Sequence, residues 1–158
     1  MLAQLKLAWW RDRLSGDKAA WPKGEPLLAG LAAWRDPAAL VALVDGWEEL
    51  LADPPVDGAA FAEGRARAMA TLAAELGLGG AEVAAVTVFA RAWALAELSL
   101  GAEGLPELPE QPASLPRAMR PLAVLAGVTL RAARYGGADA LYTPGAWLTA
   151  VRIGLLGR

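Results

Sequence analysis

A carboxylate in the second half of a mostly apolar helical stretch is the first candidate for chemistry. Glu97 lies among Val, Phe, Trp, Ala and Leu in residues 81–100. A buried carboxylate needs a partner or a raised pKa. Glu97 could make a polar contact at the bottom of an apolar pocket, or it could form a buried ion pair with an arginine such as Arg91 or Arg120. We favour the ion pair.

A second group of acids is Asp45, Glu48 and Glu49. Asp45 and Glu49 are one helical turn apart, so their carboxylates could share one face and hold a cation. The competing interpretation, which we favour, is a solvated acidic stripe. The opposite face is apolar and consists of Leu40, Leu43, Val44, Trp47 and Leu51. Arg65 and Arg67 are two residues apart and face different ways on a helix, so we expect both on the surface.

Tryptophan is unusually frequent, with seven in the chain. Trp9, Trp47 and Trp93 fall on apolar helical stripes and are expected in the core. Trp10, Trp21 and Trp147 could instead line a lipid cavity or a dimer interface. The candidate ligand-binding residues are therefore Glu97, Asp45, Glu49, Arg91, Trp10 and Trp93. We assign no catalytic residue and no metal ligand.

Composition points to an all-α fold. The chain has 158 residues, neither cysteine nor histidine, and 56% hydrophobic residues dominated by Ala and Leu. The missing residue types exclude thiolate and imidazole chemistry and disulfides, and β-formers are too sparse for a sheet. Pro, Gly and capping residues divide a single domain, 1–158, into six or seven helices. The predicted helices cover about 2–14, 26–34, 36–53, 57–76, 81–100, 114 or 120–135, and 144–158. Of these, 81–100 is expected to be the most buried, and 101–112 a connector.

Charge is uneven along the chain. Residues 114–158 hold six arginines and one acid, for +5, which leaves −7 for residues 1–113 because the total is −2. Basic C-terminal helices could bind an anion or a partner, or pack against the acidic N-terminal helices. The negative total and the lack of a basic-aromatic motif argue against nucleic acid. Charged residues interrupt every apolar run, so we expect no transmembrane segment and a cytoplasmic protein.

Four blocks carry a family resemblance: LAQLKLAWWRDRL at 2–14, LVALVDGWEELLAD at 40–53, FAEGRARAMATLAAELG at 61–77, and LPRAMRPLAVLAGVTLRAARYGG at 115–137. In order and spacing they resemble the squalene/phytoene synthase superfamily. The resemblance implies an isoprenoid synthase-type helical bundle around a long apolar cavity. Enzymes of that family hold Mg²⁺ diphosphates with two aspartate-rich helical motifs.

The departures concern those aspartates. Laid over Ala90–Leu105, the second motif places its two aspartates on Gly101 and Leu105 and its asparagine on Glu97. Leucine and glycine side chains offer Mg²⁺ no oxygen. The first motif precedes the Trp-Trp-Arg helix in the family, and here only eight residues precede Trp9.

The resemblance and the departures together predict a catalytically degenerate relative, similar to the branch that includes a respiratory complex I assembly factor. It would bind an apolar or isoprenoid-like ligand, or an assembly partner, without a cofactor. The alternative is a Mg²⁺-dependent prenyltransferase that condenses prenyl diphosphates, with Asp45, Glu49 and Glu97 as ligands. Helices missing from one wall of the family cavity would leave an apolar face exposed, so we expect a homodimer or a bound partner.

Overall fold

Alanine- and leucine-rich segments fold into seven α-helices in the part of the chain that the structure, a computed structural model, describes: residues 2–51, 58–100 and 114–157. No strand occurs in these ranges, which confirms the all-α class. The helices are α1 (Leu2–Ser15), α2 (Pro26–Leu31), α3 (Val41–Glu49), α4 (Gly58–Glu75), α5 (Gly80–Ser99), α6 (Arg120–Tyr135) and α7 (Pro144–Leu156). Four 3-10 helices accompany them: η1 (Lys18–Ala20), η2 (Pro37–Leu40), η3 (Arg117–Met119) and η4 (Gly137–Tyr142).

Local signals set most of these boundaries. Asp36 accepts a hydrogen bond from the Ala39 amide at 3.2 Å and caps η2, which leads directly into α3. Thr143 caps α7 in the same way, with a proline in the first turn. Of the two predicted starts for the sixth helix, the one at Arg120 is observed, after the short η3. The predicted end near Asp53, the predicted cap Asp57 and the connector 101–112 lie outside the described residues.

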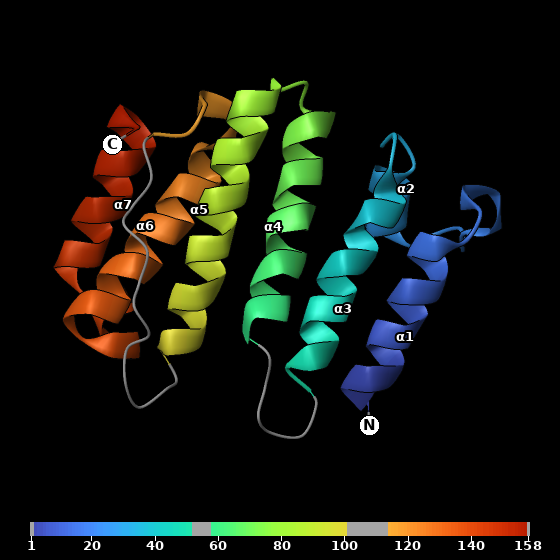
Figure 1. The fold of residues 1–158 in the computed structure, drawn as a ribbon, viewed down its shortest axis with the longest axis horizontal. Coiled ribbons are helices and arrows are strands. Elements are labelled where there is room, and N and C mark those ends of the chain that lie inside the picture. Colours follow the sequence, from blue (N-terminus) through green and yellow to red (C-terminus); the bar gives the residue numbers. More distant parts are fainter. Residues whose placement is uncertain (1, 52–57, 101–113, 158) are drawn as a thin grey trace.

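The helices form an open row (Figure 1), with α1 and α7 at opposite ends. The most extensive contacts join helices that are neighbours in the sequence, in the order α3, α4, α5, α6, α7, and α1 packs on α3. The basic helices α6 and α7 therefore lie far from α1 in the row. The basic helix α6 does pack on α5, which belongs to the acidic part of the chain, residues 1–113.

The main core lies between α4, α5, α6 and α7. Alanines let these helices approach closely, and larger side chains fill the space between them. The buried members are Ala66, Ala73, Val86, Phe89, Ala90, Leu115, Met119, Leu122, Ala123, Ala126 and Ile153. This core joins α4, α5, α6 and α7 into one packed group.

Helix α5 is not the most buried helix, contrary to the prediction. Eight of the 16 residues of α6 are buried, against seven of the 20 in α5. The apolar side chain of Val88 on α5 is 46% exposed. In an open row a helix has neighbours on two sides only, so a sequence that is apolar all round still presents one face to solvent.

Two glycines bring α3 and α4 together. A Cβ on Gly64 would lie 2.2 Å from the carbonyl oxygen of Ala42, and one on Gly46 would lie 3.1 Å from the Cα of Phe61. Only glycine allows this approach of the two backbones. The crossing fixes α3 on the C-terminal core, and α3 in turn positions the N-terminal end of the row.

Candidate functional site: an apolar pocket at the N-terminal end

A pocket of about 560 Å³ lies between α1, α2, η2 and α3. Its walls are apolar throughout. The lining residues are Leu7, Trp10, Leu14, Pro26, Leu27, Gly30, Leu31, Trp34, Leu40, Leu43, Val44 and Trp47. The volume is within the usual range for small-molecule sites. Such a lining holds a ligand by burial of apolar surface rather than by polar contacts.

Helical periodicity creates two of the walls. Leu7, Trp10 and Leu14 recur at helical spacing on one face of α1. Leu43, Val44 and Trp47 do the same on α3, so the apolar stripe predicted for that helix is the stripe that lines the pocket. Trp10, which the sequence analysis left open between a cavity and a dimer interface, lies in the pocket wall.

The third wall is the segment between α1 and α3, which hydrogen bonds hold in place. The indole nitrogen of Trp21 donates to the Arg13 carbonyl at 2.7 Å, and Lys18 donates to the Trp34 carbonyl at 2.5 Å. At the far end, Glu75 of α4 accepts from the backbone amide of Arg35 at 2.8 Å. Helix α2 ends at Leu31, earlier than the predicted helix end near Trp34, and the contacts at Trp34 and Arg35 hold Trp34 in the pocket wall.

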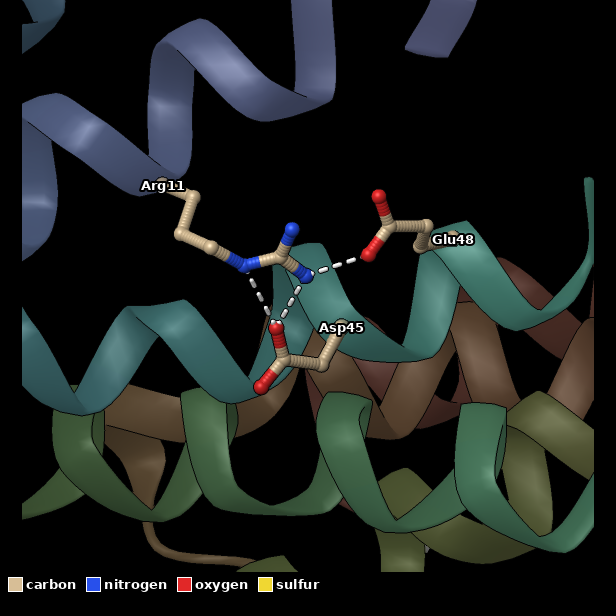
Figure 2. Close-up of polar contacts among 3 residues, drawn as sticks. All are labelled: Arg11, Asp45 and Glu48. Carbon is tan, nitrogen blue, oxygen red and sulfur yellow. Dashed lines mark hydrogen bonds and ion pairs between the residues drawn. The ribbon is translucent and has the colours of Figure 1, made fainter.

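An arginine bridges the two main walls. Arg11 of α1 reaches across to Asp45 and Glu48 of α3, with distances of 2.5 Å from Nη2 to both carboxylates (Figure 2). The hydrogen bond from Arg11 lowers the pKa of Glu48. The pKa of Arg11 is raised, mainly by its hydrogen bond with Glu48 and then by that with Asp45. The pair Asp45 and Glu49 therefore forms no joint cation site here: Asp45 is engaged by Arg11, and Glu49 is exposed. Asp45 connects helices and does not line the pocket.

Glu97 forms an ion pair, as favoured, but with an arginine that the sequence analysis expected on the surface. Its partner is Arg65 of α4. The Arg65 guanidinium lies 4.2 Å from the Trp93 ring centroid and 4.5 Å from that of Phe61. The prediction that Arg65 is a surface residue is wrong, because its side chain is 7% exposed. Glu97 itself is only half-buried, with a side chain 42% exposed, because it lies at the outer edge of this aromatic cluster.

The remaining candidates lie in other places. Arg91 is exposed and donates to Glu63 at 2.5 Å, and hydrogen bonds from Arg91 and then Arg67 lower the pKa of Glu63. Trp93 packs partly against the main core, as expected, and over Arg65. Trp9 and Trp47 are not core residues, since 37% and 42% of their surfaces are exposed. Trp9 lies on the outer helix of the row, and Trp47 contributes to the pocket wall.

The six candidate ligand-binding residues are thus not one site. Only Trp10 lines the apolar pocket, Asp45 belongs to the Arg11 bridge, and Glu97 and Trp93 surround Arg65. Sequence reasoning missed Trp34 and the leucines of α1 and α2 as pocket residues. The spacing of Leu7, Trp10 and Leu14 was the signal available for the α1 wall; nothing local marked Trp34.

The fold and this site define an all-α protein with an apolar pocket at one end of a helical row. Comparisons of the chain with protein-family models, curated proteins and solved structures find no match. Across residues 2–51, 58–100 and 114–157, no helix is long and apolar enough to cross a membrane. The same residues contain no group of three or more acidic side chains placed to hold a metal ion.

Proposed function

We propose that this chain is a catalytically degenerate squalene/phytoene synthase-like protein that binds an apolar, isoprenoid-like molecule without chemistry. The observation that carries the proposal is the pocket between α1, α2 and α3, lined by leucines and the indoles of Trp10, Trp34 and Trp47. Flexible hydrocarbon chains suit such walls, because burial of their surface needs no directional partner.

Ligand chemistry follows from what surrounds the pocket. Arg11, Asp45 and Glu48 lie on the helices of the two main walls and are bonded to one another, and Lys18 is bonded to backbone carbonyls. A neutral isoprenoid alcohol matches this environment better than a diphosphate, which would need free cationic groups or Mg²⁺. The prenyltransferase alternative would need Asp45 and Glu97 to act together, and each is paired with an arginine on a different helix.

The test is a binding titration with farnesol, followed by tryptophan fluorescence. Gly30 of α2 lines the pocket, and a Cβ there meets nothing within 4 Å. Gly30→Leu therefore occupies part of the pocket without a backbone clash, and we expect it to weaken farnesol binding about tenfold, as loss of roughly 1.4 kcal/mol would. Gly80→Leu is the matched control: its Cβ also meets nothing within 4 Å, but Gly80 lies on α5 away from the pocket.

Unchanged farnesol binding by Gly30→Leu would remove the pocket from the proposal, and no binding by the wild-type chain would reject it. A second arm adds farnesyl diphosphate with Mg²⁺ and measures diphosphate release. Metal-dependent turnover that Glu97→Ala abolishes would establish the prenyltransferase instead.

An assembly role is the second candidate, and the outer face of α1 favours it. Leu2, Leu5 and Trp9 form an exposed stripe there, with Leu2 84% and Leu5 62% exposed. We propose that two copies of the chain pair through this stripe. Light scattering should then give a dimer mass that Leu5→Glu reduces and that Leu125→Glu, an exposed position on α6, leaves unchanged. A strict monomer at micromolar concentration would reject the pairing.

A further inference from the structure

A second pocket, of about 250 Å³, lies between α6 and α7 and is lined by three arginines. Arg131 and Arg134 come from α6, Arg152 comes from α7, and Thr149 and Tyr135 complete its polar lining. Helices α6 and α7 lie at the opposite end of the row from α1 (Figure 1), so the residues that line this pocket are far from those of the apolar pocket. Neither the resemblance nor the proposed ligand makes use of it.

Arg131 is held in place before any ligand arrives. Its guanidinium lies so close to the start of α7 that a Cβ on Gly145 would be 2.4 Å from its Nη2 atom. The guanidinium carbon is also 5.8 Å from the Tyr135 ring centroid. These two contacts reduce the freedom that Arg131 would lose on binding an anion.

Among the described residues of the C-terminal part, the charge is almost entirely positive. The described residues from 114 to 157 include five arginines and a single acid, Asp139. The ion pairs among the described residues join acids of α3, α4 and α5 to Arg11, Arg65, Arg67 and Arg91, and none includes Arg131 or Arg152. Arginines gathered on one concave surface attract an anion, and phosphate oxygens match the guanidinium donors.

Exposed apolar side chains surround the pocket arginine of α7. Arg152 is separated from Leu148 and Leu156 by four residues and from Leu155 by three, so these leucines are its neighbours on the helix surface. They are 60%, 71% and 63% exposed, and Trp147 beside Leu148 is 65% exposed. A phosphorylated solute would leave this apolar surface in water. A lipid surface offers both the phosphate and the hydrocarbon.

We propose that the α6–α7 end of the row docks on an anionic phospholipid bilayer. A headgroup phosphate binds Arg131 and Arg152 in this pocket, while Trp147 and the exposed leucines of α7 enter the boundary between headgroups and acyl chains. Trp favours this boundary because its ring is apolar and its N–H is polar. The proposal is independent of ligand binding at the other end of the row.

The test is flotation of the full chain with phosphatidylcholine vesicles, with and without phosphatidylglycerol. We expect the chain to float only with phosphatidylglycerol, and less as salt is raised. Arg152→Gln should weaken the partitioning about fivefold, since one cation near an anionic surface contributes that much. Leu155→Ser should weaken it by a similar factor. The matched controls are Arg67→Gln and Leu76→Ser, exposed positions on and just after α4, and they should float like the wild type.

Each other outcome overturns the proposal. Equal flotation with both vesicles would show that the arginines do not select the headgroup. Loss with Arg152→Gln but not with Leu155→Ser, together with release by inorganic phosphate beyond that by chloride of equal ionic strength, would indicate a site for soluble phosphates. Circular dichroism melting checks that each variant is folded; all four side chains are exposed, so melting temperatures should stay near that of the wild type.

Discussion

The ion pair of Arg65 and Glu97 decides whether Glu97 is a structural residue, and a double-mutant cycle measures it. Arg65→Met removes the charge but leaves an apolar side chain of similar length between Phe61 and Trp93. Glu97→Gln removes the charge but keeps the shape of the side chain. Both single variants and the double variant are needed, because only the cycle separates the coupling of the pair from the other effects of each substitution.

The expected coupling follows from the two exposures. The Arg65 side chain is 7% exposed and that of Glu97 is 42% exposed. Breaking a fully buried pair costs about 3–5 kcal/mol and an exposed one about 0.2–1 kcal/mol, so this mixed pair should couple by about 1–2 kcal/mol. Arg65→Met alone also loses cation–π contacts with Trp93 and Phe61, each about 0.5–2 kcal/mol. It should therefore destabilise the fold more than Glu97→Gln does.

Urea denaturation followed by circular dichroism at neutral pH gives the four free energies of unfolding. The control cycle uses Arg91 and Glu63, whose side chains are 46% and 41% exposed, and its coupling should be about 0.2–1 kcal/mol. The reasoning would be refuted if the losses of unfolding free energy in the two single variants add up to the loss in the double variant to within about 0.3 kcal/mol. Glu97 would then be open to the ligand or metal role that the sequence also allowed.

Two further predictions concern the stability of the N-terminal end. Gly64→Ala should destabilise the protein by about 1–3 kcal/mol in thermal melting, because its Cβ would lie 2.2 Å from the Ala42 carbonyl oxygen. Gly80→Ala, whose Cβ would meet nothing within 4 Å, should leave the stability unchanged. Glu48 and Glu63 have lowered pKa values in the folded state, so their stabilisation is complete above the ordinary value of about 4.5 and is lost as the pH falls through the lower folded values. Melting temperature should fall below that pH, and Glu48→Gln should remove part of the dependence; a profile identical to the wild type would show that the Arg11 bridge is not maintained in solution.

Local patterns explain why the helix boundaries were largely predictable. The proline-led starts at Pro26, Pro37 and Pro144 and the capping by Asp36 act within a few residues, so they can be identified in one dimension. The stripe Leu43, Val44 and Trp47 was also identified from its spacing. What the stripe faces was not, because that depends on where α1 and α2 lie.

The charged residues show the opposite limit. The sequence gives no local sign that Arg65 is buried and Arg67 exposed, since they are two residues apart in the same alanine-rich helix. The aromatic rings that surround Arg65 come from α3, α4 and α5 together. Likewise, Arg11 is 34 residues from Asp45, and only the packing of α1 on α3 brings them together.

The sequence by itself determined the all-α class, the order and approximate length of the helices, and the apolar stripe of α3, because propensity, capping and periodicity act over a few residues. Tertiary structure alone decided that the helices form an open row, that α1, α2 and α3 enclose an apolar pocket, and that the candidate acids are divided among separate ion pairs. These features depend on which faces of distant segments meet, and that choice is made by the total apolar surface buried and by close crossings such as Gly46 with Gly64.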